Sequence, residues 1–170
     1  MIIYWLVAKH AAKEYVPLVA ACGTIAVAAL GWCVAGWIAH RNAVRQNTTN
    51  ILFARFSQAP FGEAMHRFHA TFGHDKTSLV TMENYSTLRA DTDIEKVKGA
   101  AAAAYLLNYF EFISGGVLNG DLDAKVVRDN IRGVITYYYD RCEPLIRSAN
   151  KSNSRTYEQL MKLRTHYREP

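Results

Sequence analysis

Apolar and small residues fill the chain from Val16 to Ala39 without a single charged residue. A helix over this range is roughly 36 Å long, since an α-helix rises about 1.5 Å per residue. The hydrocarbon core of a bilayer is about 30 Å thick, so such a helix crosses it with some tilt. The pattern therefore predicts a single transmembrane helix over residues 16–39.

The residues before this stretch begin apolar and then become polar. Tyr4 and Trp5 lie in the apolar start, and Lys9 is the first charged residue. A secretory signal has its positive charge first, then a short apolar region and a cleavage site with small residues. The reversed order here predicts an uncleaved anchor, with residues 1–15 forming an amphipathic segment at the membrane interface.

Beyond the apolar stretch the helical pattern continues without a break. No Gly or Pro occurs between Trp37 and Ala59, and apolar residues recur near a heptad rhythm. These residues are Val44, Ile51, Leu52 and Phe56. We expect the membrane helix to extend into the cytosol as one rod over residues 40–58.

Helix end signals divide the following residues into separate helices. Pro60 is tolerated in a first turn and predicts a helix that ends at Gly73. Residues 75–90 predict a short helix between loops. A cap at residues 91–93 then precedes the strongest soluble helix, for which Gly115 and Gly116 predict the stop.

The remaining signals complete a small helical bundle. Asn119 and Gly120 predict a turn, and Asp121 or Asp123 begins the next helix. Pro144 is expected to kink or end that helix, and Ser154 to cap a last one. No segment has strand periodicity. The sequence thus predicts an all-α protein in which residues 40–170 form a cytoplasmic helical domain.

Charge and cysteine content narrow the class of protein only slightly. The net charge is +5 and the pI about 9.2, which fits a domain near an anionic leaflet or a polyanion but does not by itself indicate nucleic acid. Cys22, Cys33 and Cys142 form no CxxC pair, so neither a disulfide framework nor a zinc site is indicated. This agrees with a domain in a reducing compartment.

The basic residues beside the predicted span indicate its orientation. The span is followed by Arg41, Arg45 and Arg55. It is preceded by Lys9 and Lys13. The positive-inside bias favours a single pass through a bacterial inner membrane with the C-terminal domain in the cytoplasm.

Small residues recur at every fourth position inside the predicted span. Such rows let helix backbones approach closely in lipid, where no hydrophobic force draws helices together. The two rows are nearly in line and form one stripe, composed of Ala20, Thr24, Ala28, Gly31, Ala35 and Ala39. One helix alone cannot use this stripe, so we expect a homo-oligomer embedded in membrane lipid.

The predicted helix before Gly115 carries two polar side chains on an apolar background, Asn108 and Glu111. A buried carboxylate must be paired, and Arg128 or Arg132 on the next helix is the natural partner. We therefore expect a buried polar network. The alternative is a pocket in which the arginines bind an anion such as a nucleotide.

Metal-binding and catalytic patterns are weak in this sequence. His66, His69 and His74 lie near Asp75, but Gly73 interrupts the helix between them. We expect no metal, no cofactor and no catalytic residue from this cluster.

A helical ribonuclease of the HEPN class requires an arginine and a histidine a few residues apart. Arg67 and His74 match that spacing, but Phe68 follows the arginine where that class has a polar residue. No glycine-rich phosphate loop, nucleophile elbow or carboxylate pair is present. The sequence therefore favours a protein that is not an enzyme.

Three short motifs resemble those of a known protein family. They are Leu107, Asn108 and Glu111, then Gly120, Leu122 and Asp123, then Pro144, Leu145 and Ile146. In this respect the chain is similar to the bacterial DUF4760 family over residues 40–165. The resemblance implies a membrane anchor and an all-helical domain, and it implies no activity.

The architecture also resembles small membrane effectors of prokaryotic antiviral systems, such as the pore-forming accessory protein of RNA-targeting CRISPR loci and effectors switched by cyclic oligonucleotides. We therefore expect a non-enzymatic, self-associating membrane effector or scaffold that forms a pore or perturbs the membrane in antiviral defence, with a protein of the defence system as a partner. The alternative is a membrane-tethered module that binds a nucleotide or RNA, or a HEPN-like ribonuclease.

Overall fold

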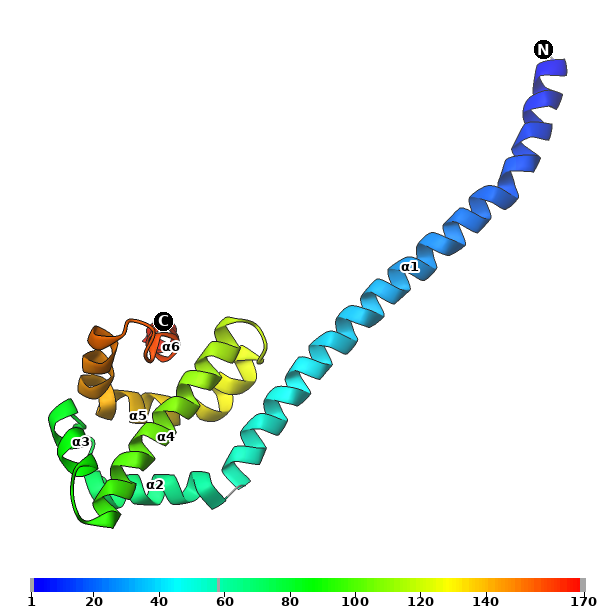
Figure 1. Ribbon diagram of the computed structural model, residues 1–170. Helices are drawn as coiled ribbons and strands as arrows, with labels where there is room; N and C mark the ends of the chain where they lie inside the picture. The colour runs from blue at the N-terminus through cyan, green and yellow to red at the C-terminus, as the bar shows by residue number, and fades with distance from the viewer. Residues whose placement is uncertain (1, 58, 169–170) are drawn as a thin grey trace. The chain divides into compact units, whose positions relative to one another are not determined.

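The computed structural model describes the backbone of residues 2–57 and 59–168 and the side chains of residues 15–54 and 59–167. Its helices are α1 (Ile2–Ser57), α2 (Ala59–Phe72), α3 (Met82–Arg89), α4 (Ile94–Leu118), α5 (Ala124–Ser152) and α6 (Glu158–Arg168) (Figure 1). No strand occurs among these described residues, which confirms the all-α prediction. The chain divides into two compact units, Met1–Ala43 and Val44–Pro170.

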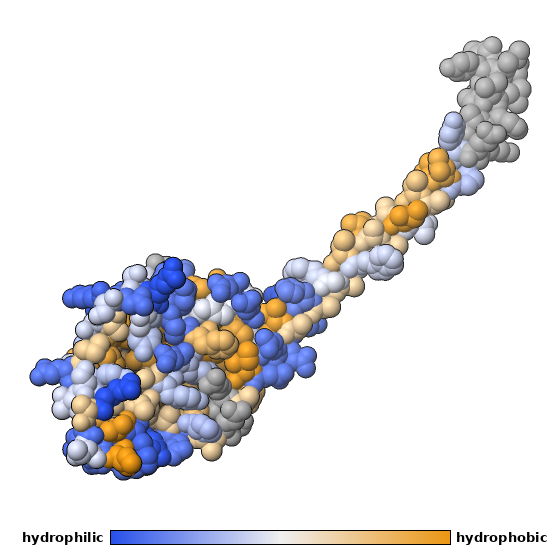
Figure 2. Space-filling view, viewed as in Figure 1, coloured by the Kyte–Doolittle hydropathy of each residue, from blue (hydrophilic) through white to orange (hydrophobic). Residues whose placement is uncertain are grey.

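Helix α1 continues beyond the predicted span without a break, as expected from the absence of Gly and Pro between Trp37 and Ala59. Every side chain from Tyr15 to Ala43 is exposed, and Figure 2 shows the apolar colouring of this stretch. Tyr15–Ala54 is long and apolar enough to cross a membrane. A signal sequence near an N-terminus also meets this criterion of length and composition. The interfacial role predicted for Tyr4 and Trp5 concerns side chains outside those that the structure describes.

The last turns of α1 belong to the helical domain. Leu52 is buried in the core, and the Thr48 side chain is buried as well. The Thr48 hydroxyl donates to the carbonyl of Val44 at 2.8 Å and accepts from the backbone N–H of Asp123 at 2.8 Å. This part of the predicted rod is thus packed against the domain on one side.

Helix α4 is the centre of the domain and packs against α2, α3, α5 and α6. Small residues along α4 let its neighbours come close. At Gly99 an added Cβ would lie 1.8 Å from the Thr71 hydroxyl on α2, so only glycine fits there. Like α1, α4 is long and apolar enough to span a membrane, but many of its apolar side chains, such as Leu106, Phe110 and Ile113, are buried in this core.

The predicted stop of α4 at Gly115 and Gly116 is wrong, because the helix continues to Leu118. Gly116 serves packing instead, since an added Cβ would lie 2.7 Å from the Leu122 side chain. The helix ends where Gly120 adopts φ +81°. The backbone N–H of Leu122 then donates to the carbonyl of Gly116 at 2.9 Å and satisfies the last turn.

Other predicted ends agree with the structure. Helix α2 ends just before Gly73, whose φ is +77°. The Asp93 carboxylate accepts from the N–H of Glu95 at the start of α4. Asp123 caps α5 in the same way.

Pro144 kinks α5 without ending it. The helix runs on to Ser152 and changes direction on the way (Figure 1). In the opened turn the carbonyl of Arg141 accepts from the N–H of Val80 at 2.8 Å, and the N–H of Leu145 donates to the carbonyl of Val80 at 3.2 Å. The loop before α3 thus supplies partners for backbone groups released by the proline.

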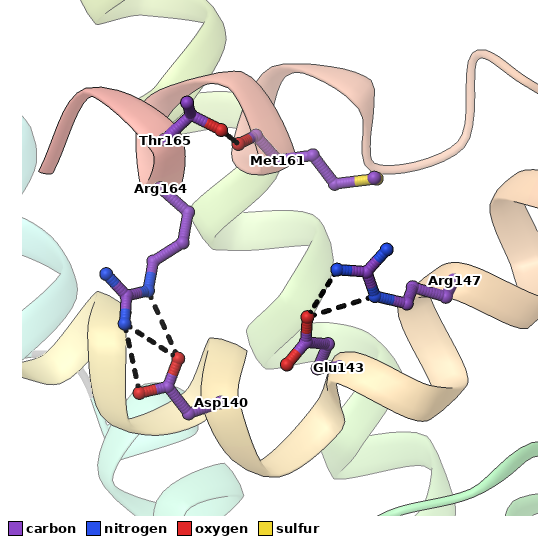
Figure 3. A network of polar contacts seen from close by, with 6 residues as sticks. All are labelled: Asp140, Glu143, Arg147, Met161, Arg164 and Thr165. Carbon is purple, nitrogen blue, oxygen red and sulfur yellow. Dashed lines mark hydrogen bonds and ion pairs between the residues drawn. The ribbon is translucent and has the colours of Figure 1, made fainter. Parts of the chain in front are cut away.

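The predicted cap at Ser154 is wrong, because α6 begins four residues later, at Glu158. Tyr157, directly before it, has φ +59°. Helix α6 is held on α5 by Arg164, which donates to both carboxylate oxygens of Asp140 at 3.0–3.2 Å (Figure 3).

Candidate functional site

The small residues of the predicted span share one face of α1. At about 100° per residue, Ala20 and Ala39 lie roughly 100° apart around the helix, and the other four fall between them. All six side-chain positions are exposed, and an added Cβ at Gly31 would have nothing within 4 Å. The Thr24 hydroxyl donates to the carbonyl of Ala20 at 2.9 Å, so this polar group needs no partner outside the helix. The stripe is therefore free for contact with another helix.

Aromatic and basic side chains meet at the C-terminal end of the stripe. The Arg41 guanidinium lies 5.4 Å from the ring centre of Trp37, at the distance of a cation–π contact. Tryptophan and arginine are both suited to the headgroup region of a bilayer. An aromatic and a basic side chain thus lie together where the apolar stretch of α1 ends.

The predicted buried network of Asn108, Glu111, Arg128 and Arg132 does not form. Asn108 and both arginines are exposed. The Glu111 carboxylate instead accepts hydrogen bonds from the backbone N–H groups of Gln159 at 3.1 Å and of Leu160 at 2.7 Å.

Glu111 therefore caps the N-terminus of α6 from a different helix. A helix N-terminus has unpaired N–H groups and a partial positive charge, so it stabilises a carboxylate without any arginine. The sequence-based pairing was wrong because the partner is backbone, which leaves no pattern in the side chains.

The two arginines have separate contacts. Arg132 donates to the carbonyl of Tyr167 at 2.7 Å, and its guanidinium lies 5.6 Å from the ring centre of Tyr167. Arg128 lies 3.6 Å from the carboxylate of Asp129. Neither arginine is buried among apolar side chains, so neither requires an internal counter-charge.

Among the side chains that the structure describes in this domain, the buried cation is Arg141, only 1% exposed. Its guanidinium donates to the carbonyls of Phe72, Gly73 and Ser78 at 2.7–3.1 Å. It also donates to the Tyr137 hydroxyl at 3.0 Å and lies 4.9 Å from the ring centre of Phe68.

These contacts fasten the loop between α2 and α3 onto α5. Sequence reasoning missed Arg141 because its acceptors are backbone carbonyls more than sixty residues away. The available signal was its position, since an arginine three residues before Pro144 lies beside the turn that a proline opens. That signal indicates a disturbed helix but does not name the loop that fills it.

His69 and His74 form part of the same cluster of side chains. The rings of His69 and His74 stack with centres 4.5 Å apart. His69 Nδ1 lies 3.4 Å from the carbonyl of Gly73, and Nε2 lies 3.1 Å from the Tyr138 hydroxyl. A carbonyl only accepts, so Nδ1 carries a proton, and in the neutral ring Nε2 accepts from the hydroxyl.

Burial lowers the pKa of His69 below its ordinary value, and the charges of His74, Arg141 and His66 add to this effect. Burial also raises the pKa of Tyr138 to about 12, so its hydroxyl keeps its proton. Among residues with described side chains, no group of three or more His, Cys, Asp or Glu is placed to hold a metal ion.

The arginine and histidine with ribonuclease-like spacing have different partners. Arg67 forms an ion pair with Glu63 one turn earlier on α2. His74 stacks on His69, beyond the end of α2. Each group is engaged in local structure.

Comparison with known proteins gives a single finding. The family described as a domain of unknown function, DUF4760, matches residues 18–167. The match covers nearly the whole chain, so the chain belongs to this family and the predicted resemblance is confirmed. No curated protein and no solved structure matches the chain.

Proposed function

We propose that this DUF4760 protein is a membrane-anchored, non-enzymatic effector or scaffold that self-associates through α1. The carrying observation is the exposed, uncharged stretch from Val16 to Ala39, in which Trp32 is 81% exposed. Monomeric soluble proteins rarely expose a continuous apolar surface of this size. A lipid bilayer is the environment that removes such a surface from water.

Several features support the anchoring part of the proposal. The Trp37–Arg41 contact places an aromatic ring and a cation where the apolar stretch ends. Arg45 follows one turn later and is exposed. These arginines favour a cytoplasmic helical domain behind a single pass through a bacterial inner membrane.

The small-residue stripe supports self-association. In lipid, helices associate by close van der Waals packing, and exposed small side chains permit it. One stripe per helix suits a dimer, whereas a closed ring needs a second contact edge. Ala21, Ile25 and Ala29 supply such an edge next to the stripe.

The proposed biological role is membrane perturbation, up to pore formation, in antiviral defence. It rests on the combination of an N-terminal apolar helix with a small helical domain, which antiviral membrane effectors share. It gives the oligomer a function that requires no catalytic residue.

Mass measurement of the full-length protein in detergent tests self-association. We expect an oligomer for the wild type and a shift toward monomer for Ala35→Leu, because leucine keeps the backbones apart. The matched control is Ala26→Leu, the same change on the opposite side of the helix, which should leave the oligomer intact. A monomeric wild type would overturn the proposal.

Two further measurements test the remaining parts. The full chain should sediment with membranes, and a protein that stays in solution without detergent would contradict the anchor. Liposomes containing the protein should release a trapped dye if it forms a pore. Loss of this release in Ala29→Leu, with dimers retained, would indicate a ring that uses the second edge.

A further inference from the structure

A pocket of about 520 Å³ lies at one end of the helical domain, between the end of α4, the start of α5 and the end of α6. Its volume falls within the range of small-molecule sites. The pocket residues used below are the basic Lys125, Arg128 and His166 and the apolar Val117, Leu118 and Leu163. We call this feature the basic pocket.

The basic side chains exceed the acidic ones at the rim. Lys125 Nζ donates a hydrogen bond to the Asp129 carboxylate, and Arg128 Nε lies 3.6 Å from the same carboxylate. One carboxylate therefore faces two cations. The Lys125, Arg128 and Asp129 side chains are 75%, 54% and 46% exposed, so they are free to turn toward a ligand. His166 adds a third basic group from α6.

Tyr167 forms part of the pocket wall and is fixed in place. Arg132 donates to its carbonyl at 2.7 Å and packs over its ring. The Tyr167 side chain is only 9% exposed, and its hydroxyl has no hydrogen-bond partner among the described residues.

We infer that the basic pocket binds a phosphate-bearing small molecule, with a nucleotide as the class that fits best. Lysine and arginine at the rim suit phosphate oxygens, to which they donate charge-assisted hydrogen bonds. The apolar wall, with Val117, Leu163 and the ring of Tyr167, suits a flat, poorly hydrated group such as a base. Neither element depends on self-association of α1, so the inference stands apart from the proposed function.

Calorimetric titration of ATP into the full-length protein in a neutral detergent tests this site. We expect saturable binding that weakens with salt, since the contacts at the rim are between charges. Lys125→Gln and Arg128→Gln should each weaken binding roughly tenfold or more, because each removes a charge-assisted hydrogen bond. Circular dichroism should show unchanged helix content, since both side chains are exposed.

The matched control is Arg147→Gln on the same helix, an exposed arginine that pairs with Glu143 away from the pocket. It should leave ATP affinity unchanged. An equal loss in this control would mean a general charge effect and would overturn the inference, as would the absence of saturable binding. So would ATP affinity that is unaffected in the Lys125 and Arg128 variants.

A second titration separates the two sources of phosphate. It uses a water-soluble short-chain phosphatidylglycerol in place of ATP. Binding of ATP that depends on Arg128 supports a nucleotide site. Binding of the lipid alone, with the same dependence, would overturn the nucleotide assignment and identify a lipid headgroup as the ligand.

Discussion

The guanidinium of Arg141 donates a hydrogen bond of 2.8 Å to the carbonyl of Gly73, across 68 residues of chain. Gly73 ends α2, and Arg141 lies in the turn of α5 that Pro144 opens. Two sets of hydrogen bonds thus connect α5 with the loop between α2 and α3. One comes from the side chain of Arg141, and the other from the backbone of Val80. The carbonyl oxygens around Arg141 supply negative charge density, which explains how this cation is buried with no carboxylate partner among the described side chains.

Replacing Arg141 should loosen the loop between α2 and α3. Arg141→Met keeps the volume but removes every donor, and we expect the free energy of unfolding to fall by about 2–4 kcal/mol. Thermal or denaturant unfolding of the full chain in detergent measures this. Arg147→Met is the control, because an exposed ion pair one helical turn long contributes about 0.5 kcal/mol or less. Equal effects in the two variants would contradict the fastening role.

Replacing Glu111 should act on α6. Glu111→Ala removes the carboxylate that accepts from Gln159 and Leu160, and loss of a cap costs about 1–2 kcal/mol. Hydrogen exchange should show faster exchange of these two amides, while α4 remains protected. Asn108→Ala, a change at an exposed position one turn away, should alter neither the stability of the protein nor the exchange of these two amides. Unchanged exchange in α6 would show that Glu111 is not its cap.

The two adjacent glycines of α4 predict opposite effects of one substitution. Gly116→Ala places a Cβ 2.7 Å from Leu122 and should destabilise the domain by about 1–3 kcal/mol. Gly115→Ala meets only Gln159 at 3.8 Å, an ordinary contact, and should stabilise the helix by up to about 1 kcal/mol. Melting temperatures of the two variants test the packing at this end of α4. A Gly116→Ala protein as stable as Gly115→Ala would contradict it.

Stability should fall in mild acid because of His69. Burial, followed by the charges of His74, Arg141 and His66, keeps the folded-state pKa of His69 below 6.5. The unfolded chain therefore takes up the proton first as the pH falls. The contribution is complete above pH 6.5 and is lost as the pH falls from there through the lower folded pKa.

The melting temperature of the full chain between pH 7.5 and 5.5 measures this loss. His69→Gln should show a smaller slope over that range, because glutamine does not titrate. His40→Gln, a change at an exposed position on α1 that is not among the causes of the His69 shift, should retain the wild-type slope. A slope unaffected by His69→Gln would assign the pH dependence to another group.

Much of the fold follows from local signals. The starts of α2, α4 and α5, beside Pro60, Asp93 and Asp123, were predictable because a cap or a proline acts on its own few residues. Gly116 and Ser154 were misread for the opposite reason. A glycine in a helix and a serine before one have the same local signature whether they end an element or serve packing, and only Leu122 and Glu111 decide between these cases.

The sequence by itself determined the long apolar stretch, the continuous α1 and the all-helical character, because these depend on composition and on the helical period along one segment. The tertiary structure alone decided that Glu111 caps α6, that Arg141 is the buried cation, and that Lys125, Arg128 and His166 share one pocket. Each of these joins groups from different helices. Their partners are backbone atoms or side chains brought together by packing around α4, and such pairings leave no spacing in the chain that could reveal them.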